Sequence, residues 1–567
     1  MLERRTAEKW ETLVAETLKS NRAPLNGATF DAIVVGAGFG GMYMLHKLRE
    51  LGLTATCFDK ATDVGGTWYW NRYPGARCDI PSMYYSYTFS DELQSEWVWT
   101  ERYATQPEIL RYAQFVAKKF DLYPMINFET AVQSAIWDDK TNLWTITTDR
   151  GDKVQARYCI MATGCLSMPR VPDIKGMESF KGPTYHTGTW PHEGVDFTGM
   201  RVGVIGTGSS GIQSIPQIAK QAKHLTVFQR TPNFSVPANN YFLTDKERQE
   251  FRDNYPQYLR MVRGIGASPE QTAAAVAGDK VTAAPPPMRR VQPTPPTKVE
   301  VRARLEQFWD TSSGTGWLGF PGMLVNQDVN DTAADFVREK ITERLEDKEL
   351  AKKLLPHDHP LGTKRICVDI DYFETYNQDH VDLVDVRDEK ITEITAKGVK
   401  TDKKEYEFDA IVFATGFDAM TGALLAIDIH SDHCDLRKAW ADGPRAYLGV
   451  MVAGLPNLFT LTGPGSPSVL SNMISSNEMH VEWVTETLSY MKENGLTRIE
   501  AEHDAQDRWV AHVNKVADTT LFPKANSWYM GANIPGKPRV FMPYVGLNYR
   551  QKVQDAVNAG YKGFTLA

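Results

Sequence analysis

Apolar positions in the first part of the chain follow a strand–helix–strand order. Residues 30–35 form a short apolar run, and Met42, Leu45 and Leu48 then recur at helical spacing. A second apolar run ends at Phe58. Short apolar runs separated by a helical period are typical of a β-α-β unit with parallel strands. We therefore expect the main body of the protein to begin with such a unit.

A glycine-rich turn joins the first strand of this unit to its helix. The turn contains Gly36, Gly38 and Gly41, and Asp59 follows the next strand. Glycines at these positions permit a tight turn and a close approach of the backbone to a pyrophosphate, whose charge lies at the helix N-terminus. Asp59 can accept hydrogen bonds from a ribose. We interpret the turn as a dinucleotide site, and a glycine turn without a ligand is the alternative.

The same layout returns later in the chain. Residues 202–205 predict a strand, residues 206–211 a second glycine turn, and residues 225–229 the next strand. The pattern therefore predicts a second dinucleotide site.

One position differs between the two units and indicates which nucleotide each binds. Gln229 stands where Asp59 stands in the first unit, and Arg230 and Thr231 follow it. An acid there would repel a 2′-phosphate, whereas a guanidinium can hold it with two hydrogen bonds. We therefore assign FAD to the first site and NADPH, rather than NADH, to the second. A plain surface charge at Arg230 is the alternative.

The two units predict an α/β fold with two Rossmann-like dinucleotide-binding domains, one for FAD and one for NADP, and a helical insertion in the NADP domain. Apolar runs end in Ala-Thr-Gly at 161–164 and 413–416, and in flavoproteins with two dinucleotide domains such segments mark where the chain leaves and re-enters the FAD domain. The expected division is a leader helix at 1–29, a first part of the FAD-binding domain at 30–165, an NADP-binding domain at 166–390 with its helical insertion at 235–350, and a second part of the FAD-binding domain, with a mobile C-terminal loop, at 391–567.

Two segments allow more than one interpretation. The leader carries one apolar stripe, which favours a helix packed on the main body over a partner-binding arm. Residues 268–298 are rich in Ala and Pro, which favours a tolerated irregular insertion over a lid.

Composition excludes several classes of protein. A net charge of −7 over 567 residues provides no basic field for nucleic acid or anionic lipid. No run of apolar residues is long enough to span a membrane. The six cysteines form no C-x-x-C pair, which fits reduced thiols in a cytoplasmic protein. His357 and His359 have no obvious third ligand, so we expect no metal site.

An aromatic connector between the two glycine turns carries the most specific pattern in the chain. Its defining positions are Phe180, Gly182, His186, Trp190 and Pro191. A second pattern combines Gly65-Gly66-Thr67-Trp68 with Tyr-Pro-Gly at 73–75 and Asp79. Both resemble the fingerprints of the type I Baeyer–Villiger monooxygenases, and within that family the chain is most similar to the phenylacetone monooxygenase group.

The resemblance implies an enzyme that uses FAD, NADPH and O₂ to convert ketones to esters or lactones. The implied route runs through a C4a-peroxyflavin and a tetrahedral adduct, with sulfoxidation as a side reaction. We expect a small ketone and O₂ as partners, no nucleic acid, no membrane, and a monomer or weak oligomer.

Such a reaction needs a permanent cation, which keeps the flavin peroxide deprotonated and stabilises the oxyanion of the adduct. By the resemblance, Arg365 is that cation and Asp79 is the carboxylate that orients it. The alternatives are a surface Lys364–Arg365 pair and an Asp79 that caps a local turn. His186 lies in the connector, so we expect structural hydrogen bonds from it rather than acid–base catalysis.

The resemblance also assigns other side chains to the cofactors and the substrate. The FAD site would include, besides the first turn, Asp59, Lys60, Gly66, Thr67, Trp68, Asp79, Tyr85 and Met473. The NADP site would include Gly206, Thr207, Gly208, Ser209, Ser210, Gln213, Arg230, Thr231 and Lys364, with Trp528 on a mobile segment. Ser468, Val469 and Leu470 would border the substrate pocket.

Two other functions compete with this interpretation. One is a flavin N- or S-monooxygenase of the same two-domain class, whose fingerprint lacks the Trp190-Pro191 ending and the catalytic arginine. The other is a non-catalytic flavoprotein that binds NADPH as a sensor. A disulfide reductase would need a redox C-x-x-C pair, which the chain lacks.

Overall fold

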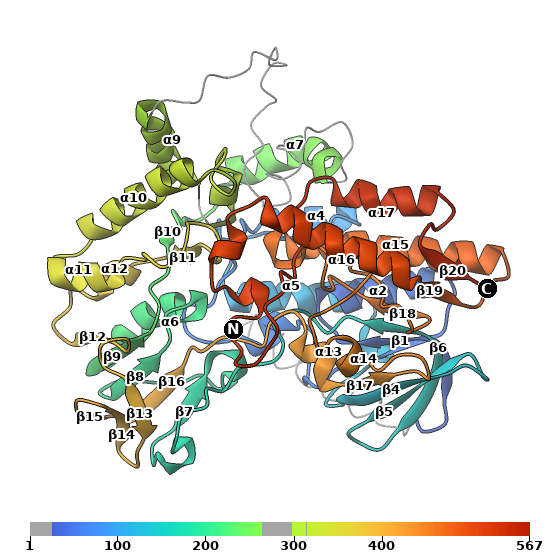
Figure 1. The fold of residues 1–567 in the computed structure, drawn as a ribbon, viewed down its shortest axis with the longest axis horizontal. Helices are drawn as coiled ribbons and strands as arrows, with labels where there is room; N and C mark the ends of the chain where they lie inside the picture. Colours follow the sequence, from blue (N-terminus) through green and yellow to red (C-terminus); the bar gives the residue numbers. More distant parts are fainter. Residues whose placement is uncertain (1–24, 263–297, 313) are drawn as a thin grey trace.

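The computed structural model describes residues 25–262, 298–312 and 314–567. Within these ranges two large β-sheets organise the chain, one at the lower left and one at the lower right of Figure 1, with helices packed around both. The expectations for the leader helix and for the Ala- and Pro-rich segment fall, apart from their last residues, outside the described ranges.

The larger sheet has eight strands and carries the first glycine turn. Its order is β17-β4-β5-β6-β1-β2-β3, with β18 also paired to β6. Along one edge of β6, the first residues pair with β5 and the last three pair with β18. The strands are β1 (Thr29–Val35), β2 (Ala55–Phe58), β3 (Ile126–Asn127), β4 (Val132–Asp138), β5 (Leu143–Thr148), β6 (Lys153–Met161), β17 (Asp428–His430) and β18 (Leu458–Thr460).

The second sheet has five strands in the order β12-β9-β8-β16-β7, all of them parallel to their neighbours. The strands are β7 (Thr184–His186), β8 (Arg201–Ile205), β9 (His224–Gln229), β12 (Val381–Asp385) and β16 (Ala410–Phe413). The sequence division placed everything from residue 391 with the first unit, but β16 lies between β7 and β8. The chain returns to the larger sheet only after β16, at β17 and β18. Short strands complete the fold: β10 (Ser235–Pro237) pairs with β11 (Cys367–Asp369), β13 (Ile391–Ile394) with β14 (Gly398–Thr401) and β15 (Glu405–Glu407), and β19 (Ile499–Ala501) with β20 (Phe564–Leu566).

Helices cover both sheets. Those of the first unit and the C-terminal part are α2 (Phe39–Glu50), α3 (Thr67–Trp70), α4 (Asp91–Glu96), α5 (Gln106–Lys119), α13 (Gly422–Ala426), α14 (Leu436–Ala439), α15 (Met473–Glu493), α16 (His503–Asp518) and α17 (Tyr549–Asn558). Those of the second unit are α6 (Ser209–Ala219), α9 (Lys298–Thr311), α10 (Gln327–Glu343), α11 (Lys348–Leu354) and α12 (Tyr372–Thr375). Helix α7 (Asp245–Val262) follows β10 in the chain but packs against Tyr84 of the first unit through Tyr258. Residues 235–350 are thus mainly helical where they are described.

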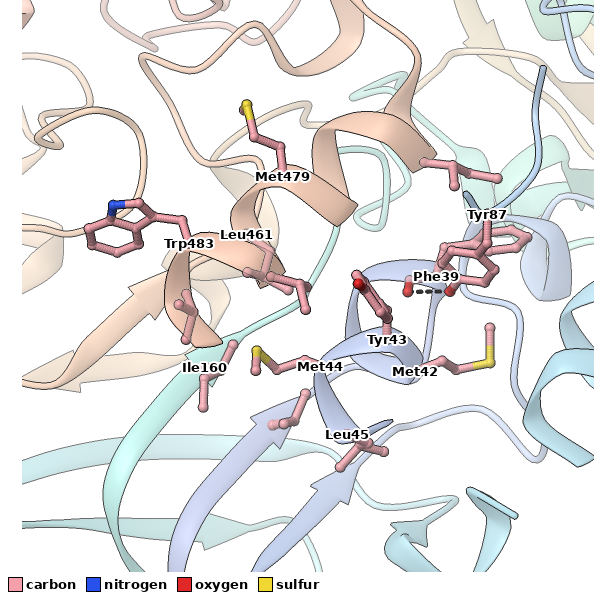
Figure 2. Packing of buried hydrophobic residues seen from close by; sticks show 14 of the residues in the cluster. Phe39, Met42, Tyr43, Met44, Leu45, Tyr87, Ile160, Leu461, Met479 and Trp483 are labelled. Carbon is pink, nitrogen blue, oxygen red and sulfur yellow. Dashed lines mark hydrogen bonds between the residues drawn. The ribbon is translucent and has the colours of Figure 1, made fainter. Parts of the chain in front are cut away.

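Helix α2, which starts at the first glycine turn, is buried on several sides. Figure 2 shows Met44 between Ile160 of the sheet and Leu461, with Met479 and Trp483 of α15 beyond them. Tyr87 donates a hydrogen bond to the backbone carbonyl of Phe39. This packing fixes the helix N-terminus, and with it the glycine turn, against the rest of the fold.

Candidate active site

A cavity of about 640 Å³ lies where the two units meet. Its wall contains, among others, the expected residues Gly36, Gly38, Asp59, Lys60, Gly66, Thr67, Trp68, Asp79, Tyr85, Ser209, Ser210, Gln213, Arg365, Val469, Met473 and Trp528. The structure therefore brings together residues that are up to several hundred positions apart in the chain.

Two glycines of the first turn, Gly36 and Gly41, leave no room for a side chain. Gly36 has φ +107°, and a Cβ there would lie 2.5 Å from the carbonyl oxygen of Ala162. A Cβ on Gly41 would lie 1.8 Å from the carbonyl oxygen of Gly36. The turn leads into α2, whose N-cap makes no side-chain hydrogen bond, so backbone N–H groups remain for an anion. This bare backbone cradle fits the pyrophosphate of a dinucleotide.

Asp59 stands at the end of β2 and fixes this turn. Its carboxylate accepts backbone hydrogen bonds from Ala37 at 2.6 Å and from Ala61 at 2.8 Å. Burial raises the pKa of Asp59, and the two N–H donors oppose that rise. The side chain lines the cavity, so its place is compatible with the expected ribose contact.

Aromatic side chains form a wall near the turn. Trp68 donates its indole N–H to the hydroxyl of Tyr85 at 3.0 Å, and their rings meet edge to face. Burial raises the pKa of Tyr85 well above its usual value, so this phenol stays neutral. The ammonium of Lys60 lies over the ring of Trp70 at 5.0 Å.

Arg365 and Asp79 form a forked ion pair inside the cavity. Nε and Nη2 of Arg365 donate to the two carboxylate oxygens of Asp79 at 2.7 Å each. Nη1 donates to the backbone carbonyl of Val469. Burial alone would lower the pKa of Arg365, but the Asp79 carboxylate outweighs it and holds that pKa above its usual value. The pair therefore presents a permanent and rigidly oriented positive charge.

Two residues next to this pair were not found from the sequence. Tyr529 is buried beside Arg365, and burial raises the pKa of its phenol to about 12 while the guanidinium opposes the rise. Cys165 lines the cavity, and burial raises the pKa of its thiol to about 11. Tyr529 follows Trp528 directly, so that neighbour was the only signal for it; nothing in the sequence set Cys165 apart from the other cysteines.

The second glycine turn is built like the first. Gly206 has φ +112°, and a Cβ there would lie 2.4 Å from the carbonyl oxygen of Ala414. A Cβ on Gly208 would meet no atom within 4 Å, so that position faces open space. Thr207 donates to the carbonyl of Thr231 at 3.1 Å, which joins the turn to the end of β9.

The N-terminal end of α6 touches the first unit. The hydroxyl of Tyr73 donates to Oε1 of Gln213 at 2.8 Å, and Nε2 of Gln213 donates to the carbonyl of Arg77 at 3.1 Å. The hydroxyl of Ser209 lies 3.3 Å from the thiol of Cys367. The two hydrogen bonds of Gln213 join α6 to the first unit, while the Ser209 contact lies within the second unit; Ser209 and Gln213 both line the shared cavity.

The two cations expected at the NADP site, Arg230 and Lys364, interact electrostatically with each other. Arg230 is exposed, and Lys364 is largely buried with Asp358 at 3.6 Å. Burial lowers the pKa of Lys364, Asp358 opposes the change, and Arg230 lowers the pKa further. Neither side chain lines the 640 Å³ cavity. Their like charges lie close enough to interact, which suits a shared phosphate.

The connector residues serve the second sheet rather than the cavity. His186 lies at the end of β7; its Nδ1 accepts from the N–H of Gly188 at 2.9 Å, and its Nε2 lies 3.1 Å from the hydroxyl of Thr415. Burial lowers the pKa of His186. Trp190 is buried against Tyr185 and Phe197.

The remaining connector residues complete this packing. Phe180 packs against the hydrophobic cluster on the second sheet, and Pro191 is half-buried. A Cβ on Gly182 would lie 2.6 Å from the carbonyl of Asp409, so only glycine fits there without a shift.

The three residues expected to border the substrate pocket do not all line the cavity. Ser468–Leu470 form a single 3-10 turn, in which Val469 lines the cavity while Ser468 is fully buried, with φ +44°. Leu470 packs against the hydrophobic cluster that contains Val469 and Tyr529. Of the three residues, only Val469 reaches the cavity wall.

Comparison with known proteins adds independent findings. Residues 33–264 match the family model described as pyridine nucleotide-disulphide oxidoreductase. A Baeyer–Villiger monooxygenase of Pseudooceanicola batsensis is 42% identical, covering 94% of this chain and 96% of that protein. A phenazine N-monooxygenase of Lysobacter antibioticus is 40% identical, covering 95% and 97%. A solved structure of oxidized steroid monooxygenase bound to NADP has a TM-score of 0.86 at 46% identity, covering 95% and 99%.

These identities extend along almost the whole chain, not over one nucleotide unit alone. The chain belongs to the Baeyer–Villiger monooxygenases. The fold class, the flavoprotein monooxygenase activity and the FAD and NADP cofactors expected of this monooxygenase are thereby confirmed. The family model spans both glycine turns, but all six cysteines of the enzyme are free, so no redox disulfide accompanies them.

Two further observations concern the described part of this monooxygenase. None of its described helices has the length and apolar character needed to cross a bilayer. Among the described residues, no three His, Cys, Asp or Glu side chains are grouped to hold a metal ion. Nδ1 of His359 instead lies 2.6 Å from the carboxylate of its neighbour Asp358.

Proposed function

We propose that this enzyme converts ketones to esters or lactones with NADPH and O₂. The observation that carries the proposal is the Arg365 guanidinium, held by Asp79 in a cavity that reaches both glycine turns. When bound, FAD supplies activated oxygen after reduction by NADPH and reaction with O₂. The protein must then stabilise negative charge on oxygen beside a carbonyl group, which is the task of a fixed cation.

The Asp79–Arg365 pair is suited to that task for two reasons. Arginine stays protonated at every working pH, and its fork matches a carboxylate, so its direction is set before substrate arrives. Losing one such preorganised contact typically costs about 3–4 kcal/mol of transition-state stabilisation, roughly 10²–10³ in rate. In this proposal Arg365 holds the developing negative charge, and Asp79 keeps the guanidinium in position.

The other residues of the site would bind the cofactors and keep water away from the substrate. The Gly36–Gly41 turn and Asp59 would hold FAD, with Trp68 and Tyr85 against it, while the second turn would hold NADP(H). Arg230 and Lys364 would bind the 2′-phosphate, because two cations there match its two negative charges. Val469, Met473 and Trp528 would close the substrate side and exclude water.

We also infer a revised domain division. An FAD-binding domain comprises residues 30–165 together with the chain after about residue 416, because β17 and β18 pair in the larger sheet. An NADP-binding domain lies between them and includes β16. Six free cysteines support a reducing compartment such as the cytoplasm.

N-oxygenation is the second candidate, because a phenazine N-monooxygenase is 40% identical to this chain. Holoenzyme incubated with NADPH, O₂ and a panel of ketones, sulfides and aromatic nitrogen heterocycles distinguishes the two. Esters or lactones in the product analysis support the proposal, whereas oxides alone support the rival. A protein that consumes no O₂ with any of these compounds would instead be the NADPH-binding sensor.

A further inference from the structure

A second cavity, of about 390 Å³, lies beside the first. Tyr73, Arg77 and Gln213 line both cavities, so the two share a wall. The second cavity is bounded by residues of the first unit on one side and by α6 and the β11 segment on the other. A molecule bound there would contact both nucleotide units at once.

Arg72 supplies a prepared cation to this cavity. Its Nε donates to the carbonyl of Tyr69 at 2.7 Å, and its guanidinium lies over the Tyr69 ring at 4.9 Å. The side chain is half-buried, and burial lowers its pKa. Among the described residues no carboxylate forms an ion pair with it. The carboxylate that acts on it is Asp63, which opposes the lowering of its pKa but forms no close pair with it. A guanidinium that is oriented and makes no close ion pair can still bind a carboxylate through two parallel hydrogen bonds.

The rest of the wall restricts what can bind. Val368 and Ile370 stand with Pro107 on the apolar part of the lining. Gln217 of α6 adds an amide that has no hydrogen-bond partner among the described residues. A volume of about 390 Å³ falls in the range of small-molecule sites. Charge on one side and apolar surface on the other select a small molecule with an acidic head and a short hydrocarbon body.

We propose that the second cavity binds a small aliphatic or aryl carboxylate, whose head group is held by Arg72 and Gln217 and whose body lies on Val368 and Ile370. Such a ligand bridges the two units, so it stabilises the arrangement seen in this structure relative to any other. Free inorganic phosphate shares the head-group chemistry but gains nothing from the apolar wall.

Calorimetric titration of the FAD-loaded full chain with hexanoate tests the proposal. Saturating NADP⁺ is present so that anions cannot occupy the second glycine turn. We expect saturable hexanoate binding. Hexanamide, which lacks the negative charge, and inorganic phosphate, which lacks the hydrocarbon body, should each bind at least about tenfold more weakly.

Two variants report on the site, and one serves as a control. Arg72→Gln removes the cation, and Gln217→Glu places a like charge beside the head group; each should weaken hexanoate about 10- to 100-fold. Lys220→Gln, which removes an exposed charge just beyond the end of α6, should leave the affinity unchanged. Thermal melting without hexanoate checks that each variant is folded. If Arg72→Gln does not fold, the hexanoate affinity of Gln217→Glu tests the proposal instead.

Several results would overturn the proposal. These are equal hexanoate affinity in the wild type and in both site variants, equal affinity for hexanoate and hexanamide, or tighter binding of phosphate than of hexanoate. Binding that disappears when NADP⁺ is added, or no saturation up to about 10 mM, would have the same consequence.

Discussion

Replacing Arg365 by alanine removes three hydrogen bonds: two to Asp79 at 2.7 Å and one to the Val469 carbonyl. Transition-state stabilisation should fall by about 3–4 kcal/mol, so ester formation should drop roughly 10²- to 10³-fold. The Asp79 carboxylate, still partly exposed to water, loses its partner, which should lower the free energy of unfolding by about 1–3 kcal/mol. NADPH oxidation should persist, because the second glycine turn is untouched.

The assay follows ester formation and NADPH consumption in parallel on one FAD-loaded sample. Arg365→Lys is the matched control, because it keeps the positive charge but cannot make the paired hydrogen bonds of a guanidinium to Asp79. Ester formation in this variant should fall about tenfold. Ester formation at the wild-type rate in Arg365→Ala would refute the role given to this cation. Equal loss of ester formation and NADPH oxidation would point instead to damage of the nucleotide sites.

Three further changes test other parts of the site. Arg230→Ala should reduce the preference for NADPH over NADH by about 10- to 100-fold, measured as the ratio of kcat/KM values, and an unchanged ratio would contradict the phosphate contact. Trp528→Ala should raise NADPH oxidation that yields hydrogen peroxide instead of ester, because the substrate side loses a wall; unchanged coupling would show that Trp528 does not seal the site. Gly41→Ala should give protein that purifies without FAD, because the new Cβ would lie 1.8 Å from the Gly36 carbonyl oxygen; retention of the normal flavin absorbance would disprove the need for glycine there.

The positions of the two glycine turns could be predicted from the sequence because local signals determine them. Short apolar runs end directly at Gly36 and Gly206, and the observed strands β1 and β8 begin within one residue of the expected starts. Backbone geometry at such turns depends on a few neighbouring residues, so periodicity and glycine spacing are sufficient.

Long-range pairing was harder to predict. The sequence could not place β16, which the expected division put with the first unit and which pairs in the structure with β7 and β8, because its Ala-Thr-Gly ending marks a chain crossing without showing on which side of it the strand pairs. The Asp79–Arg365 pair joins residues 286 positions apart, and only a family resemblance suggested it. Tyr529, Cys165 and the second cavity arise from tertiary packing, which no local pattern in the chain encodes.

The edge of β6 has a consequence for how the protein is made. Cys159–Met161 pair with β18, which is synthesised roughly 300 residues later. At typical ribosomal speeds that interval is about 15–60 s, during which the end of a central strand has an open backbone edge. The nascent chain therefore carries an aggregation-prone surface until β18, in the last fifth of the chain, emerges. Fragments that stop before residue 458 should be captured by chaperones or precipitate, however well their glycine turns are formed.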